Sequence, residues 1–399
     1  MDFYRHWFTN STAGKPLTYF LVYLISIVFT FQSLLTAYSS STYLELFTLP
    51  QYVGLIYAVA AFFAMLVTLV LPLILRKIGN IATTISLMLI MTLALVIVGL
   101  GLNPPLTIIA FIIFMAISPQ IYFNIDIFLE TLIGNAEGST GTKRGFILAL
   151  MSLAAFFSPL VMGYIIGDNN NLAGVYYAAA AIGLIFIAII LTYFRQFYDP
   201  DYQVIKLKGL LSKAFSSVNV STVLITQFLL QFFYTWAIIY FPLYLATVIG
   251  FSWETIGHII AVGLFAFVIF EYPIGIIADR HIGEKEMMAF GFVVLALCAA
   301  SMTFLVGATV IWWMILMFIS RFGASLVEVT TESYFFKQVK GQDADLISLF
   351  RLMRPLGNLL GALVGSIALF FLPMSYIFII LALIMASGAF ITQRLTDTK

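Results

Sequence analysis

Long apolar runs separated by short polar breaks dominate the 399-residue chain. Each run has about the 20 residues that a membrane-spanning helix needs, and the breaks hold Gly, Pro, Asn or charged residues that end helices. The pattern predicts twelve spanning helices, at residues 17–43, 52–75, 80–101, 105–133, 144–167, 172–195, 219–248, 255–278, 286–306, 309–336, 346–371 and 374–393. We therefore predict an all-α integral membrane protein.

Composition agrees with this pattern, because 62% of the residues are hydrophobic and only 9% are charged. Ordinary soluble domains have about a quarter charged residues, so the chain has no room for a large soluble domain. The 19 Lys and Arg against 18 Asp and Glu leave no concentrated basic surface, which excludes a nucleic-acid partner. One cysteine and three scattered histidines show no metal-ligand spacing. We predict no cofactor and no enzyme activity.

The positions of Lys and Arg predict the topology. Sixteen of the 19 lie in alternate connections or tails, and the opposite loops have none, as expected when cytoplasmic loops retain positive charge. Both termini are therefore expected in the cytoplasm. The longest connection, 196–218, is a predicted cytoplasmic linker between six-helix halves at 1–195 and 219–399. The short loops favour a location of the protein in the plasma membrane of a prokaryote, that is, in its inner membrane.

The two halves resemble each other when the sequence is shifted by about 203 residues, a repeat pattern found in membrane transporters. Residues 31–54 then lie over residues 234–257. Gly79 falls opposite Gly283 with one indel. Asp126 and Glu130 fall opposite Glu328 and Glu332. The coincident charges favour a true internal repeat.

After the eighth predicted helix, the chain carries Gly275, Asp279, Arg280, Gly283 and Lys285 in a G-x-x-x-D-R-x-x-G-x-K arrangement. With the twelve spans, the repeat and the central linker, this loop resembles the signature of the major facilitator superfamily. The resemblance implies two pseudo-symmetric six-helix bundles, a transporting monomer and alternating access. It also implies that Gly275, Asp279, Arg280 and Gly283 form a conformational gate. The alternative is a solvated turn without an energetic role.

The corresponding loop of the first half departs from that signature. Arg76, Lys77 and Gly79 are kept, but Leu71 and Leu75 stand where Gly and Asp are expected. A gate in the first half is therefore open to question.

Ionisable residues inside spans are costly and mark functional sites. Arg321, Ser325, Glu328 and Glu332 are spaced by four, three and four residues, so they share one helical face. Tyr122, Asp126 and Glu130 form a similar stripe, and Glu271 lies in another span. Burial and like charge both oppose full ionisation of paired carboxylates, which makes proton binding near neutral pH feasible.

We predict proton coupling by Asp126, Glu130, Glu271, Glu328 and Glu332. The alternative for the four stripe carboxylates is hydration or pairing with basic residues near the helix ends, namely Lys143, Arg144, Lys337, Arg351 and Arg354. For Glu271 it is a structural pair with a basic residue of the span at 346–371.

The family resemblance implies that helices 1, 4, 7 and 10 surround a central cavity. Helices 1 and 7 independently show polar faces at helical spacing, with amides, hydroxyls and aromatic rings that suit a small solute. The candidate cavity or substrate residues are Gln32, Thr36, Tyr122, Gln227, Gln231, Tyr234, Trp236 and Arg321. Small residues at Gly357, Gly361 and Gly365 are typical of close helix packing.

These observations favour a secondary active transporter whose partners are a small solute, protons and the lipid bilayer. Ser158, Pro159 and Gly163 resemble part of an antiporter motif in the fifth helix, which favours proton-linked efflux. Facilitative or symport uptake is the alternative within transport. A nontransporting receptor on the same fold is the alternative outside it.

Overall fold

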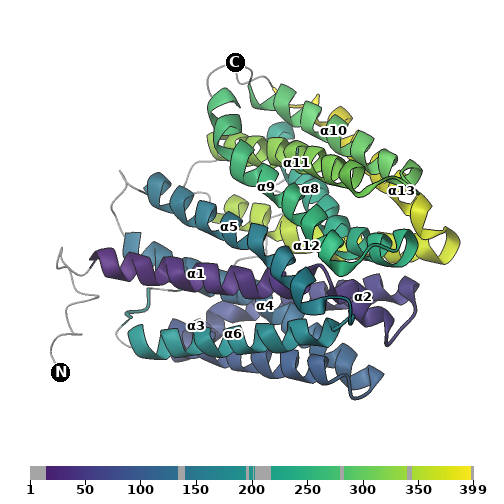
Figure 1. Cartoon of the computed structure of the whole chain (residues 1–399). Coiled ribbons are helices and arrows are strands. Elements are labelled where there is room, and N and C mark those ends of the chain that lie inside the picture. The colour runs from purple at the N-terminus through teal and green to yellow at the C-terminus, as the bar shows by residue number, and fades with distance from the viewer. Residues whose placement is uncertain are drawn as a thin grey trace. The chain divides into compact units, whose positions relative to one another are not determined.

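The computed structural model describes residues 15–133, 140–194, 197–200, 202, 217–278, 283–338 and 344–396. The regular elements within these ranges are helices (Figure 1). In the first part of the chain they are α1 Lys15–Ala37, α2 Ser40–Glu45, α3 Pro50–Leu100, α4 Pro104–Ile133, α5 Thr140–Ile166 and α6 Leu172–Tyr193. In the second part they are α8 Val218–Tyr244, α9 Trp253–Ile277, α10 Glu284–Phe304, α11 Val310–Gln338, α12 Ala344–Phe371 and α13 Met374–Thr392. The predicted all-α class is confirmed.

Eleven helices in the described ranges are long and apolar enough to cross a membrane. One of them, α3, has 51 residues, and its backbone leaves helical geometry at Gly79, with φ 79° and ψ 168°. At about 1.5 Å per residue, 51 residues would reach more than twice the roughly 30 Å of a bilayer core. The break at Gly79 therefore divides α3 into two spans, which agrees with the twelve predicted helices.

Two predicted helices are subdivided. The span predicted at 17–43 is interrupted at Tyr38 and Ser39, between α1 and α2. Both residues are buried, and residues 39–42 read Ser-Ser-Ser-Thr. The predicted span runs through this polar run, because small hydroxyl residues are also common inside membrane helices. The span predicted at 219–248 changes after Tyr244 into a short π-helical turn, Leu245–Ile249, which ends at Gly250 with φ 80°.

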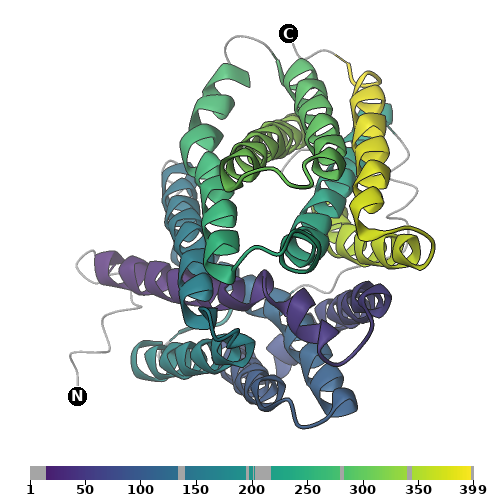
Figure 2. The same ribbon diagram turned by 45° about the vertical axis from the view of Figure 1, so that its right-hand side comes forward.

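The chain forms two compact units, the first from Met1–Ala37 and Phe62–Val204 and the second from Tyr38–Ala61 and Ile205–Lys399. In the first unit, α1 packs against α4, α5 and α6. In the second, α8 packs against α11, α12 and α13, while α10 lies beside α13 and α11 lies beside α9 (Figure 2). The helix α3 contributes residues to both units.

Aromatic rings fill the interior of each unit. In the first, Phe114 packs edge-on against Phe111 and Tyr176, with ring centroids 4.9 and 6.2 Å apart. In the second, Tyr244 contacts Trp313 and Phe378 at 5.9 and 5.1 Å. Edge-to-face pairs stabilise beyond the area they bury, so they fix the helices that hold the polar residues described next.

Candidate functional site

The polar stripe predicted for the tenth span lies on α11, and its burial falls along the helix. Arg321 is only 2% exposed and Ser325 is fully buried. Glu328 is partly buried, and Glu332, one turn further, is exposed. The stripe therefore carries its positive charge deep in the unit and its negative charges nearer the end of the helix.

Arg321 lies against aromatic rings and a glycine. Its guanidinium carbon is 5.6 Å from the centroid of the Phe233 ring and 5.9 Å from that of Tyr234, distances at which the π face attracts a cation. On α9, a Cβ atom at Gly263 would come within 3.3 Å of the Arg321 Cγ atom. The lack of a side chain at Gly263 thus leaves room for the arginine stem. The Arg321 Nε atom is buried and has no hydrogen-bond partner among the residues that the structure describes.

Tyr234 connects α8 with the carboxylates. Its hydroxyl donates a hydrogen bond of 2.5 Å to Glu328 Oε2. Glu271, on α9, lies close enough to Glu328 and Glu332 for their negative charges to repel its own. The structure therefore brings Tyr234, Glu271, Arg321, Glu328 and Glu332 into one group within the second unit. We call these five residues the charged cluster.

The other candidates on α8 differ in their surroundings. Trp236 is fully buried and donates its indole N–H to the Gly361 carbonyl oxygen at 2.8 Å. A Cβ atom at Gly357 would lie 2.7 Å from the Gln231 Cβ atom, so α12 passes very close to α8. Trp236 thus joins two helices. Gln227 Oε1 and Gln231 Nε2 are buried without hydrogen-bond partners.

The first-unit candidates make contacts between helices. Gln32 is fully buried and its Nε2 donates to the Ala179 carbonyl oxygen on α6 at 2.9 Å. Thr36 donates to the Ser33 carbonyl oxygen at 3.2 Å. The ring of Tyr122 meets Phe29 edge-on at 4.7 Å. The contacts of Gln32 and Tyr122 pack α1 against α6 and α4, whereas the Thr36 bond lies within α1.

Asp126 and Glu130 are both exposed on α4.

Neighbouring residues of α4 form a buried polar group. Asn124 donates to Thr84 Oγ1 at 3.0 Å, and Asn80 donates to the Asn124 carbonyl oxygen at 3.0 Å. Gln120, one turn earlier, donates to the Ala64 carbonyl oxygen at 3.0 Å. Sequence reasoning missed this amide group. Its signal was the spacing of Gln120 and Asn124 on one turn of an apolar helix.

The loop at Gly79 is stabilised by residues that follow α6. Asp199 Oδ1 accepts a hydrogen bond of 2.6 Å from the Asn80 N–H. Arg76 Nε donates to the Tyr202 carbonyl oxygen at 2.6 Å, and the Tyr202 hydroxyl donates to Asp199. Burial, with that hydrogen bond and the aspartate charge, raises the pKa of Tyr202 above its usual value. A carboxylate thus caps the helix that begins at Asn80, although Leu75 replaces the aspartate expected inside the loop.

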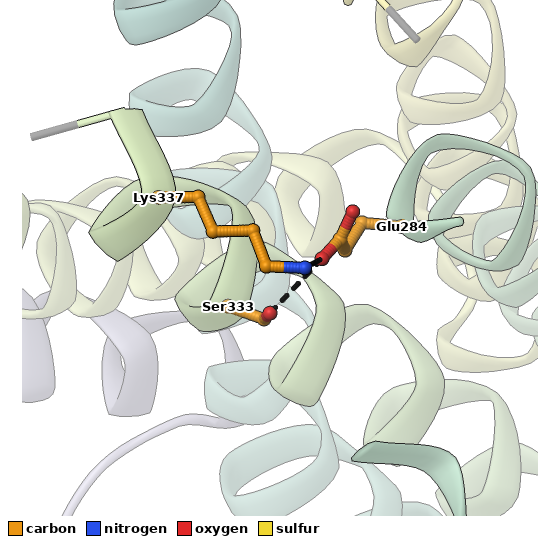
Figure 3. Close-up of polar contacts among 3 residues, drawn as sticks. All are labelled: Glu284, Ser333 and Lys337. Atoms are coloured by element: carbon orange, nitrogen blue, oxygen red, sulfur yellow. Dashed lines mark hydrogen bonds and ion pairs between the residues drawn. The ribbon is translucent and has the colours of Figure 1, made fainter. Parts of the chain in front are cut away.

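The equivalent loop of the second unit is stabilised by Glu284, which is fully buried at the start of α10. Ser333 donates to Glu284 Oε1 at 3.1 Å, and Lys337 forms an ion pair with the same oxygen (Figure 3). The preceding Gly283 has φ 93°. Among the predicted gate residues, Asp279 and Arg280 lie outside the described residues. A Cβ atom at Gly275 would lie 3.8 Å from Val329, an ordinary van der Waals distance. Sequence reasoning did not select Glu284.

Solved structures with the same fold are transporters. A nucleoside transporter, NupG, superposes with a TM-score of 0.72 at 14% identity, covering 94% of this chain and 98% of its own. A POT family transporter in complex with 5-aminolevulinic acid superposes with a TM-score of 0.76 at 12% identity, covering 96% of each chain. At these identities the likeness establishes the fold.

The sequence itself matches one family model in two overlapping segments. No curated protein matches the chain, but the Major Facilitator Superfamily model matches residues 138–344 and 223–398. These segments cover more than half of the chain and agree with the helical architecture. The protein is a multi-pass membrane transporter that belongs to the major facilitator superfamily.

Proposed function

We propose that this chain is a proton-coupled secondary transporter of a small solute and that the charged cluster is its coupling site. The observation that carries the proposal is the hydrogen bond from Tyr234 to Glu328, between a buried arginine and further carboxylates. Ionisable groups inside membrane spans are costly and are found where substrates or ions pass. A fully structural role would not require three carboxylates within one group.

The chemistry of the cluster suits reversible proton binding. When Glu271, Glu328 and Glu332 are all ionised, their neighbouring negative charges repel one another. A proton bound by one of them relieves this repulsion. The bond from Tyr234 ties the charge of Glu328 to the position of α8. Protonation of Glu328 therefore changes the contact between α8 and α11, which is how a proton could bias a conformational change.

The proposal includes alternating access by the predicted halves at 1–195 and 219–399, joined by the linker at 196–218. It also includes a monomer in the plasma membrane with both termini in the cytoplasm. It assigns no catalytic chemistry to the chain. The exposed carboxylates Asp126 and Glu130 are secondary candidates, because they are not part of the charged cluster.

The direction of transport needs a measurement. The prediction of efflux rests on the motif resemblance around Ser158, whose hydroxyl donates to the Ala154 and Phe31 carbonyl oxygens at 2.7 and 3.3 Å. These contacts pack α5 against α1 and favour neither direction. Efflux and uptake are distinguished by the orientation of the proton gradient that accelerates flux.

The test is solute flux into sealed proteoliposomes with and without an imposed pH gradient. Glu328→Gln is compared with Glu254→Gln, which changes an exposed glutamate in the first turn of α9. We expect gradient-driven flux in the wild type and in Glu254→Gln, and flux that ignores the gradient in Glu328→Gln. Gradient-driven flux that survives in Glu328→Gln would contradict the role of Glu328. Solute binding without any flux would turn the interpretation towards a receptor.

A further inference from the structure

We infer that Arg321 binds a carboxylate group of the transported solute, so that the substrates are small organic acids. This inference rests on the proposed transport function and assigns the chemical class of its cargo. It concerns the substrate side of the charged cluster, whereas the proposed coupling concerns its carboxylates.

The first observation is a buried positive charge with an unused donor. Arginine stays protonated in proteins, so Arg321 carries its charge at 2% exposure near the middle of α11. Its Nε–H has no acceptor. A buried charge without a partner is unfavourable, because its hydration is lost and no ion pair replaces it. A ligand that supplies a charge-assisted hydrogen bond would offset that cost.

The second observation is that the carboxylate of Glu328 is engaged elsewhere. Glu328 lies two turns from Arg321 on α11 and accepts its hydrogen bond from Tyr234. Among the described residues of the second unit, no carboxylate oxygen forms an ion pair with the Arg321 guanidinium; the ion pair seen there joins Lys337 and Glu284. Tyr38 also lies close enough to interact electrostatically with Arg321. Its neutral hydroxyl does not balance the charge of the arginine. Arg321 thus has no ion-pair partner among the described residues of its own unit.

The surroundings indicate the shape of the ligand. A guanidinium is a planar fork that matches the two oxygens of a carboxylate. The rings of Phe233 and Tyr234 lie beside it at 5.6 and 5.9 Å, so an apolar or aromatic body would meet apolar surface. Gln231, one turn before Tyr234 on α8, has a buried amide nitrogen without a partner. It offers a second hydrogen-bond donor to an oxygen-rich ligand.

Charge balance connects this inference with proton coupling. A carboxylate on Arg321 adds one negative charge, and a proton on Glu328 removes one. If both bind together, the net charge of the cluster is the same with and without its cargo. Crossing the membrane then carries no extra charge through the low-dielectric interior. This pairing favours symport of acid and proton over exchange.

The test is ligand-induced thermal stabilisation of the purified full-length protein, using acids and their uncharged amides as matched probes. The pairs are benzoate with benzamide, nicotinate with nicotinamide, and lactate with lactamide, and benzylamine represents an organic cation. We expect at least one acid to raise the melting temperature in a saturable way while its amide does not. The binding should weaken about 30-fold or more in Arg321→Gln, the smallest loss expected when one partner of a buried charge pair is removed.

Two further variants keep the result interpretable. Arg321→Lys keeps the charge but loses the fork, so it should bind the acid with intermediate affinity. Arg394→Gln changes an exposed arginine just after α13 and should bind the acid like the wild type. If Arg321→Gln does not fold, Gln231→Leu replaces it, and weaker acid binding in that variant supports the inference.

Three outcomes would overturn the inference. These are benzylamine binding in preference to the acids, equal binding of an acid and its amide, and acid binding that is unchanged in Arg321→Gln or its replacement. Absence of stabilisation by every acid in the panel also counts against it. None of these touches the proposed coupling, because pH-driven flux of a cation or neutral solute would still depend on Glu328. Conversely, acid binding together with flux that does not respond to a pH gradient would contradict the proposed coupling but not the assigned substrate class.

Discussion

Gly79 in the first unit and Gly283 in the second share a backbone conformation but differ in the side chains around them. Gly79 has φ 79° and ψ 168°, and Gly283 has φ 93° and ψ 157°. Each glycine precedes the first residue of a helix that a carboxylate stabilises. Asp199 supplies it in the first unit, from 119 residues further along the chain, whereas Glu284 supplies it in the second from the helix itself.

The difference shows which part of the repeat is retained. A φ near +80° is one that only glycine adopts without strain, and both copies keep glycine. The negative charge near the helix N-terminus is also present twice, as the helix dipole favours, but it comes from unrelated positions. Leu75, in place of the family's aspartate, therefore does not leave the first loop without a carboxylate.

The largest expected effect comes from breaking the ion pair of the second loop. Lys337→Met leaves the buried Glu284 carboxylate without its cation, and Lys337 is 44% exposed. We expect a loss of roughly 2 kcal/mol, below the ~3–5 kcal/mol typical of fully buried pairs. Lys337→Met combined with Glu284→Gln should recover most of that loss. Melting temperatures in detergent measure both, and a double variant no better than the single one would show that the pair is not coupled.

A smaller effect should separate the backbone of the first loop from its carboxylate. Gly79→Ala forces an L-residue into positive φ, and its Cβ atom would lie 2.5 Å from Asp199 Oδ2. Gly307→Ala is the matched control, because Gly307 has φ 86° and nothing within 4 Å of the added carbon. Backbone strain should cost each variant about 1 kcal/mol, the lower end of the range for such conformations. Gly79→Ala should lose more and should also expose the residues after α6 to protease; equal losses would mean that Asp199 contributes nothing.

The smallest expected effect is an alkaline one at Tyr202. Its pKa is raised in the folded protein, so the folded state holds the phenolic proton more tightly than the unfolded state does. The resulting stabilisation is complete below the ordinary tyrosine pKa of about 10 and is lost as the pH rises above it. The difference between the spectrophotometric titrations of wild type and Tyr202→Phe reports the ionisation of Tyr202. It should occur above the ordinary tyrosine pKa, and Asp199→Asn should shift it to lower pH. Ionisation at the ordinary pKa would mean that the contact with Asp199 is absent.

The helices could be predicted from the sequence, since each span must contain about 20 apolar residues whatever its packing. The break at Tyr38 and Ser39 was not predicted, although residues 39–42 are Ser-Ser-Ser-Thr, because membrane helices also accommodate small hydroxyl residues. The polar stripe of α11 followed from its spacing alone. Its partner Tyr234 required knowledge of how α8 meets α11, and the cap from Asp199 required a contact between distant segments.

The comparison of α4 with α11 also shows that the sequence predicts helical faces but not the contacts between helices. Asp126 and Glu130 occupy positions equivalent to Glu328 and Glu332 by sequence, yet Asp126 is exposed and Glu328 is partly buried against Tyr234. Periodicity places such residues on one face of a helix but does not say what covers that face. Trp236 was predicted to line a cavity because of its position on α8. Its indole N–H donates to the Gly361 carbonyl oxygen, and this bond joins α8 to α12.

The most direct test of proton coupling is the movement of protons themselves. Proteoliposomes with a trapped pH-sensitive dye would receive a transported solute at equal pH on both sides, in wild type, Glu328→Gln and Glu254→Gln. The account predicts that the solute gradient changes the internal pH in the wild type and in Glu254→Gln and leaves it constant in Glu328→Gln. Solute entry at an unchanged internal pH in the wild type would contradict it.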